Sequence, residues 1–167
     1  MKDRRKTLLY MCQAAMTACI YVVLTVVFAT ISFNLIQIRV AEALCILPMF
    51  TNAAVPGLFL GCLIGNLSGG GILIDVIFGS LATLIGAAGG YALRFNRWLV
   101  PIPTVVANTL IVSPILKYGY LIDAPLWLIM VCLFIGEMIS SYVLGEILGS
   151  ALLKHRRILF KKDKILI

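Results

Sequence analysis

Residues 37–86 read QIRVAEALCILPMFTNAAVPGLFLGCLIGNLSGGGILIDVIFGSLATLIG. This segment is strongly apolar, yet it contains the polar side chains of Arg39, Glu42, Asn66 and Asp75. Polar groups are costly in a lipid core, and those that persist there usually have a function. The segment therefore predicts a membrane protein that binds a solute in a pocket built partly from these residues.

The composition of the whole chain agrees with this interpretation. Of its 167 residues, 62% are hydrophobic and only 13% are charged, and the mean hydropathy is +1.07. Soluble domains carry about 25% charged residues, so the deficit indicates lipid as the solvent. One membrane span needs about 20 residues, so the chain has room for about six spans and for no separate soluble domain. We predict an all-α polytopic membrane protein with six transmembrane helices in a single domain over residues 1–167, with spans near 7–31, 37–50, 53–67, 72–93, 98–116 and 125–153.

The net charge of +7 is unevenly distributed along the chain. All Lys and Arg residues except Arg39 and Lys117 lie in three clusters beside apolar runs, at 2–6, 94–97 and 154–164. This is the positive-inside pattern of membrane proteins and not the footprint of a nucleic-acid-binding protein. It predicts a multi-pass protein of the cell membrane with both termini cytoplasmic, and with Asn34, Ser68–Gly71 and Lys117–Asp123 outside. The first apolar run is too long for a signal peptide and is expected to be retained.

The sequence lacks the motifs of an enzyme. Its single histidine, His155, lies in the basic tail, and it has no His-Glu-x-x-His pair and no Gly-x-Ser-x-Gly elbow. The five cysteines are scattered without metal or redox spacing, and we interpret them as small buried hydrophobes. The glycines at 69–71 lack the Gly-Lys-Ser/Thr ending of a nucleotide-binding loop. We therefore expect no catalysis, no metal and no cofactor, and an energy source in another protein.

Small residues at four-residue spacing mark two helices. Ala14 and Ala18 lie one turn apart in the first span, and Gly57, Gly61 and Gly65 repeat the same spacing in the third. Such edges let membrane helices approach closely. For Ala14 and Ala18 two interpretations remain open, which are packing within the chain and contact with a partner helix.

Several polar residues are candidates for the binding site, and each has a structural alternative. Arg39 and Glu42 are three residues apart and can form an ion pair on one helical face, either as a structural element or as part of a binding site. Asp75 lies about one turn inside its span, where the helix dipole alone favours a negative charge. Asn108 is the strongly polar side chain inside the fifth span, and Tyr118 and Tyr120 lie in the loop that follows.

The sixth predicted span contains two carboxylates, at Glu137 and Glu146. These are nine residues apart, so on an α-helix they point to opposite faces and cannot share a site. Glu146 lies nearer the basic tail and is expected to be its structural partner. Glu137 lies deeper, on the same face as Ser140 and Ser141, and is the strongest candidate for ligand binding.

The segment from Arg39 to Gly86, together with nearly all of the remaining chain, resembles the queuosine-precursor family of substrate-binding (S) subunits of energy-coupling-factor (ECF) transporters. The first span, with Ala14 and Ala18, is also similar to the S-subunit surface that docks on the coupling membrane subunit. The resemblance implies a six-helix S subunit without enzymatic activity that binds queuine or a related 7-deazaguanine base on the outer side. Its partners would be the coupling subunit and two cytoplasmic ATPases.

The same resemblance implies a pocket built from the later helices and the outer loops. The residues placed there by depth and polarity are Glu137, Asp75, Glu42, Arg39, Asn66, Asn108, Tyr118 and Tyr120. Two alternatives remain beside this interpretation. One is an S subunit for another small vitamin-like solute, since one fold can host varied ligands. The other is a membrane assembly protein whose buried charges merely pair with each other.

Overall fold

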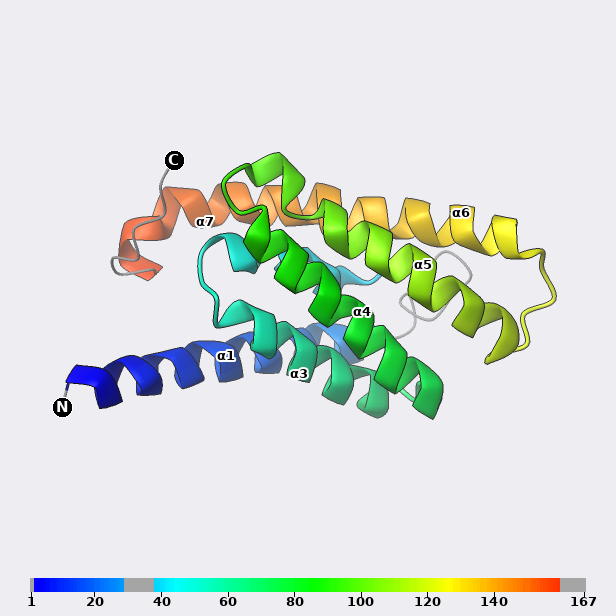
Figure 1. The fold of residues 1–167 in the computed structure, drawn as a ribbon, viewed down its shortest axis with the longest axis horizontal. Coiled ribbons are helices and arrows are strands. Elements are labelled where there is room, and N and C mark those ends of the chain that lie inside the picture. Colours follow the sequence, from blue (N-terminus) through cyan, green and yellow to red (C-terminus); the bar gives the residue numbers. More distant parts are fainter. Residues whose placement is uncertain (1, 29–37, 160–167) are drawn as a thin grey trace.

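The computed structural model describes residues 2–28 and 38–159 of the chain, and the side chains of residues 4–28 and 38–154. The described part is helical throughout, which confirms the all-α prediction. Six α-helices and three shorter 3₁₀ or π segments follow one another in the described residues. Figure 1 shows their arrangement. The helices are α1 (Lys2–Val27), η1 (Val40–Met49), α3 (Ala54–Ser68), α4 (Leu73–Ala92), η2 (Arg97–Leu99), α5 (Ile102–Tyr118), α6 (Leu126–Glu137), η3 (Met138–Leu144) and α7 (Gly145–Leu159).

The prediction of six full spans is only partly confirmed. Within the described residues, four helical segments are long and apolar enough to cross a membrane: Arg4–Val27, Leu73–Ala92, Arg97–Tyr118 and Leu126–Lys154. The segments predicted as spans at 37–50 and 53–67 form the shorter helices η1 and α3. η1 is a ten-residue 3₁₀-helix, about 20 Å long at 2.0 Å per residue, and α3 has 15 residues at about 1.5 Å each. Both are shorter than the roughly 30 Å hydrocarbon core of a bilayer.

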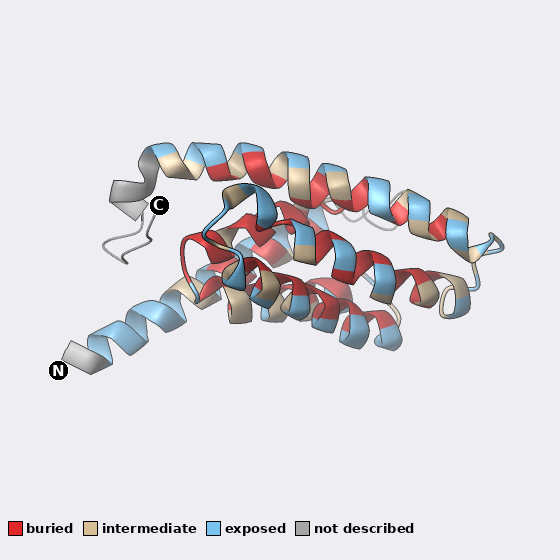
Figure 2. Ribbon diagram, turned by 45° about the horizontal axis from the view of Figure 1, so that its top comes forward, coloured by how far each residue is buried: buried red, intermediate tan, exposed pale blue. Residues whose placement is uncertain are grey.

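The helices surround η1 as a bundle. α3 packs against α1 and α4, α4 packs against α5, and α5 packs against α6. η1 contacts α1, α4, η3 and α7, and eight of its residues are buried, including Glu42. Figure 2 shows the buried residues facing the middle of the bundle and the exposed residues facing outward. Since the exposed residues include many large hydrophobic side chains on the long helices, the outer surface suits contact with lipid.

The glycine edge of α3 is a close-packing surface, as the sequence predicted. A Cβ atom added at Gly57 would lie 2.7 Å from the carbonyl oxygen of Ala14, and one at Gly61 would lie 2.7 Å from Cβ of Tyr21. No side chain fits at these distances, so α1 and α3 are in backbone contact. This contact positions Tyr21 and η1 at the centre of the molecule.

The sixth predicted span is one long helical segment with a change of winding in its middle. α6 leads into η3, a π-helix of seven residues, and η3 leads into α7. A π-helix is wider than an α-helix, is rare, and frequently occurs at functional sites. η3 begins directly after Glu137 and contains Ser140 and Ser141, all three of which are buried.

Candidate functional site

A first group of buried polar residues joins η1, α3 and α1. Arg39, directly before η1, is only 4% exposed, and its guanidinium donates a hydrogen bond to Oδ1 of Asn66. Glu42 is completely buried, and it accepts hydrogen bonds from the Tyr21 hydroxyl at 2.5 Å and from Cys45 Sγ at 3.0 Å. Both carboxylate oxygens of Glu42 therefore have partners inside the protein.

Cys62 extends this group toward α4. Its sulfur accepts hydrogen bonds from Nδ2 of Asn66 at 3.5 Å and from Oγ1 of Thr83 at 3.3 Å. Sulfur is a weak acceptor, so these contacts fill space and satisfy donors more than they add strength. We call the whole group the paired network, which consists of Tyr21, Arg39, Glu42, Cys45, Cys62, Asn66 and Thr83.

Asp75 and Tyr120 connect the start of α4 to the loop after α5. The Tyr120 hydroxyl donates to Oδ2 of Asp75 at 3.0 Å and accepts from the backbone N–H of Ile72 at 3.2 Å. Partial burial, followed by the negative charge of Asp75, raises the pKa of the Tyr120 hydroxyl, which therefore stays a donor to Asp75 at neutral pH. Asp75 is 3% exposed, and its other oxygen, Oδ1, has no hydrogen-bond partner in the protein.

A second buried group lies between α5 and the junction of α6 with η3. Glu137 is 1% exposed and accepts a hydrogen bond from Nδ2 of Asn108 at 2.9 Å. The second carboxylate oxygen, Oε2, has no partner, and neither has the amide oxygen of Asn108 or the hydroxyl of Ser140 or Ser141. An unpaired buried polar atom costs about 1–3 kcal/mol, so several in one place need a reason. We call these residues the open cluster: Asn108, Glu137, Ser140 and Ser141.

The two groups belong to one electrostatic region. Glu137 interacts with the charges of Glu42 and Arg39, and Arg39 also interacts with Asp75. This region thus contains three buried carboxyl groups and one guanidinium. Carboxylates with a free oxygen bind N–H donors and cations strongly in a buried environment, so the arrangement suits a ligand that is rich in N–H donors or carries a positive charge.

The predicted site residues do not all lie together. Asn66 and Asp75 approach each other at Gly79, where an added Cβ would lie 3.2 Å from Asn66 Nδ2 and 3.0 Å from Asp75 Oδ1. Asn108 lies beside Glu137, and Tyr120 lies beside Asp75. Tyr118, in contrast, is 70% exposed at the end of α5 and makes none of these contacts.

One expectation about charge pairing is wrong. Within the described residues, the ion pair expected between Arg39 and Glu42 is not made, because Arg39 bonds to Asn66 and Glu42 bonds to Tyr21 and Cys45. An ion pair does form between Glu146 and Arg97, which also donates to the hydroxyl of Ser150. Glu146 therefore binds the connection between α4 and α5, and its predicted contact with the basic tail stays a prediction, since the side chains beyond residue 154 are outside the described part. The end of that tail, at 160–167, and the loop at Asn34 lie outside the described residues.

Ala14 and Ala18 pack against α3 of the same chain. Gly57 and Gly61 of α3 approach their backbone atoms, which is the intramolecular alternative considered for this spacing. The neighbouring Ala15 and Cys19 are exposed on the opposite side of α1. The predicted contact of Ala14 and Ala18 with a partner subunit stays a prediction.

Sequence reasoning missed Tyr21, Cys45, Cys62 and Thr83. The sequence pattern of the cysteines predicts small hydrophobic residues. However, the three-residue spacing of Glu42 and Cys45 places these two side chains on one helical face. Tyr21 lies in an apolar run with no local sign of its role, since its partner is 21 residues away. No three His, Cys, Asp or Glu side chains within 4–28 and 38–154 come together in a way that could hold a metal ion.

Comparison with known proteins identifies the family. The model of the family described as QueT transporter matches residues 11–154, which includes every residue of the paired network and of the open cluster. No curated protein and no solved structure matches the chain. This chain belongs to the QueT transporter family, in agreement with the resemblance found in the sequence.

Proposed function

We propose that this QueT family member is the substrate-binding (S) subunit of an ECF importer, and that it binds queuine or a related 7-deazaguanine without chemically changing it. The observation that carries the proposal is the open cluster. Its unpaired polar atoms are buried in a chain that belongs to a transporter family. A ligand that pairs these atoms would remove the free-energy cost of leaving them unpaired.

The chemistry of a 7-deazaguanine fits the atoms that lack partners. Its ring N–H and exocyclic amine groups are donors, and Glu137 Oε2 and Asn108 Oδ1 are acceptors without a donor. The hydroxyls of Ser140 and Ser141 can donate to or accept from the remaining polar atoms of the base. An aminomethyl substituent would be cationic, and the excess of carboxylates over Arg39 in this region favours such a charge.

Asp75 and Tyr120 are proposed to form the outer end of the site. They join the start of α4 to the loop after α5, and Asp75 Oδ1 is still free to accept a hydrogen bond. Tyr120 can also stack its ring on a planar base. Arg39, Glu42 and Asn66 would line the site beside Asp75, mainly through the charge of Arg39, since their own hydrogen bonds are made within the paired network.

Replacing Glu137 by Gln tests the proposal. The substitution keeps the size of the side chain but removes its charge and turns one acceptor oxygen into a donor amide. We expect binding of queuine or of its aminomethyl precursor to weaken at least about tenfold, since a buried donor left unpaired costs about 1–3 kcal/mol. The dissociation constant is measured by calorimetry on the purified chain in detergent, and a thermal-shift panel of other small vitamin-like solutes tests the alternative ligands.

Glu146→Gln is the matched control. It makes the same chemical change on the same long helical segment, but Glu146 is paired with Arg97 and makes no contact with the open cluster. Ligand binding should be unchanged in this variant. If both variants bind equally well, Glu137 is structural and the ligand site must be sought around Asp75 and Glu42.

The proposed orientation places both termini in the cytoplasm. It is supported by the clustering of Lys and Arg at 2–6, 94–97 and 154–164, and by the position of the start of α1 and of α7 at the same end of the bundle in Figure 1. A cysteine at position 96, in a variant that lacks the five native cysteines, should be protected from a membrane-impermeant thiol reagent added to intact cells. Efficient labelling from outside would contradict this orientation.

The proposed partners are a coupling membrane subunit and two ATPases, because the sequence has no nucleotide-binding motif of its own. The exposed side of α1 is available for the coupling subunit, with Ala15 and Cys19 at its surface. A bulky residue at Ala15 is a better probe of this contact than one at Ala14 or Ala18, whose replacement would also disturb the packing of α1 on α3. Copurification with an ATPase measures the association.

A further inference from the structure

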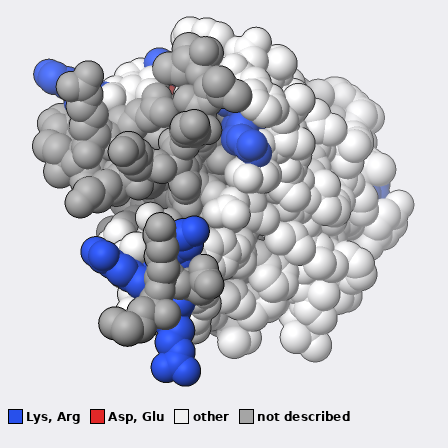
Figure 3. Space-filling view, turned by 60° about the vertical axis from the view of Figure 1, so that its left-hand side comes forward, with Lys and Arg blue, Asp and Glu red and all other residues white. Residues whose placement is uncertain are grey.

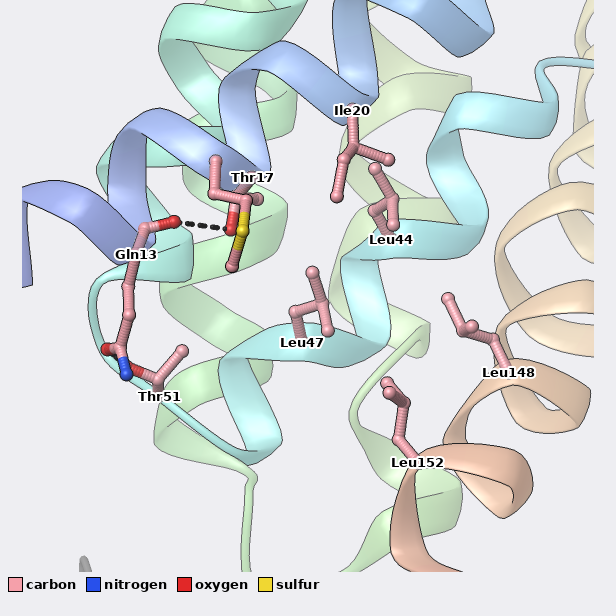
Figure 4. A pocket seen from close by; sticks show the side chains of 9 residues that line it. Gln13, Thr17, Ile20, Leu44, Leu47, Thr51, Leu148 and Leu152 are labelled. Carbon is pink, nitrogen blue, oxygen red and sulfur yellow. Dashed lines mark hydrogen bonds between the residues drawn. The ribbon is translucent and has the colours of Figure 1, made fainter. Parts of the chain in front are cut away.

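A second region of interest is a pocket between α1, η1 and α7, separate from the buried polar groups (Figure 4). Its volume is about 310 Å³. η1 packs against both α1 and α7, so it forms the floor between them. The lining residues are Gln13, Met16, Thr17, Ile20, Leu44, Leu47, Thr51, Leu148 and Leu152.

The lining is apolar inside and open at the surface. Met16 and Ile20 are 62% and 44% exposed, whereas Leu44 is only 6% exposed. The polar side chains are already paired with each other: Thr51 Oγ1 donates to Gln13 Oε1 at 2.9 Å, and Thr17 Oγ1 donates to the carbonyl oxygen of Gln13 at 2.9 Å. The pocket therefore offers an apolar surface and has little need of a polar ligand group.

Basic side chains lie on both helices beyond the pocket. Arg4, Arg5 and Lys6 are exposed on α1, and Lys6 precedes Gln13 by seven residues, or about 10 Å along the helix. Lys154 is exposed on α7, two residues after the lining residue Leu152. Figure 3 shows Lys and Arg side chains gathered on this face of the molecule.

Basic residues outnumber acidic ones on these two helices. Asp3 stands among four basic residues at 2–6 of α1, and Glu146 of α7 is already ion-paired with Arg97. An apolar pocket next to unbalanced positive charge matches a molecule that has an apolar tail and an anionic head. Anionic lipids are attracted by such clusters of Lys and Arg close to a membrane surface.

We propose that this pocket binds one acyl chain of an anionic membrane phospholipid, whose head group is attracted by the basic side chains of Arg4, Arg5, Lys6 and Lys154. An apolar helix of a partner protein is a poorer fit, because it has no anionic group for the basic side chains beyond the pocket. The lipid would occupy the space between α1 and α7 without involving Glu137 or Asn108. The site is therefore independent of the ligand proposed above.

Native mass spectrometry of the full chain tests the proposal, after transfer from nanodiscs that contain equal amounts of phosphatidylglycerol and phosphatidylcholine. We expect one phosphatidylglycerol to be retained in preference to phosphatidylcholine. Met16→Trp should abolish retention by filling the pocket from its exposed side, and Leu148→Phe should do so from the inner side. The triple variant Arg4→Gln, Arg5→Gln, Lys6→Gln should lower the preference for phosphatidylglycerol at least about fivefold, since each basic residue near a membrane surface contributes to the attraction.

Leu110→Trp is the matched control, because Leu110 is 57% exposed on α5 and does not line the pocket. It should retain phosphatidylglycerol like the unmodified chain. Equal retention by the Met16→Trp and Leu148→Phe variants, both eluting as folded monodisperse protein, would overturn the proposal. A second result would also overturn it. If the unmodified chain retains no lipid but copurifies with a membrane polypeptide, and the Met16→Trp variant loses that polypeptide, the occupant of the pocket is a protein helix.

Discussion

The paired network and the open cluster are equally well buried, but they differ in how their polar atoms are satisfied. In the paired network, both oxygens of Glu42 and the amide oxygen of Asn66 have partners, from Tyr21 of α1, Cys45 of η1 itself and Arg39. In the open cluster, Glu137 and Asn108 bond to each other and still have one free acceptor atom each. A buried carboxylate in a membrane helix is thus no sufficient sign of a binding site. The unpaired atoms beside it are the more specific sign.

The largest expected effect comes from breaking the paired network at Arg39. Arg39→Met keeps much of the apolar stem but removes the buried guanidinium that donates to Asn66 and lies in one electrostatic region with Glu42, Asp75 and Glu137. Leaving buried charge uncompensated costs about 3–5 kcal/mol, so we expect a large loss of stability or a failure to fold. The free energy of unfolding in mixed micelles measures the effect. If the Arg39→Met chain is fully stable and only fails to bind ligand, Arg39 belongs to the ligand site and does not stabilise the fold.

A smaller loss of stability is expected when the same network is disturbed indirectly, at the contact of α1 with α3. In Gly61→Ala the new Cβ would lie 2.7 Å from Cβ of Tyr21, whose hydroxyl holds Glu42. Overpacking of this kind costs about 1–3 kcal/mol, here measured as a lower unfolding midpoint. Gly145→Ala is the control, since its Cβ would meet its nearest neighbour at an ordinary 3.4 Å. If Gly61→Ala is as stable as Gly145→Ala, the close contact of α1 and α3 does not support the network.

The smallest effect on stability, but a measurable one on binding, is expected in the open cluster. Ser140→Ala and Ser141→Ala remove hydroxyls that have no partner in the protein, so the stability should stay within about 0.5 kcal/mol or rise. If the ligand bonds to these hydroxyls, each substitution should weaken its binding by about 2–10-fold, which corresponds to one neutral hydrogen bond. Calorimetry and thermal unfolding on the same samples separate the two quantities. Lower stability with unchanged affinity would show that the hydroxyls serve the fold.

Part of the fold and of the candidate site can be predicted from local patterns in the sequence. Its composition and apolar runs identified the helical class, because lipid exposure requires long apolar helices. Glycine spacing located the contact surface of α3, and depth within the last span identified Glu137 and its serines. These are local patterns, which a linear sequence displays directly.

Other features depended on partners that are distant in sequence. In place of the expected ion pair, Arg39 donates to Asn66, and Glu42 accepts from Tyr21 and Cys45, of which only Cys45 is local to Glu42. Hydrophobicity alone predicts spans at 37–50 and 53–67, whereas the 3₁₀ winding of η1 and its burial among α1, α3, α4, η3 and α7 are tertiary effects. The partner of Glu146 within the described residues, Arg97, is likewise distant in the sequence.

The π-helix in the last span has a further consequence, which concerns helical phase. An α-helix completes a turn in about 3.6 residues, so positions nine apart, such as 137 and 146, would point to opposite sides. A π-helix needs more residues for each turn, and η3 therefore delays the rotation of everything that follows it. Glu137 and Glu146 are both buried, at 1% and 7% exposure, one toward Asn108 and the other toward Arg97. The widened turns act as a phase shift that lets one continuous membrane segment direct two carboxylates inward, at two different depths and to two different partners.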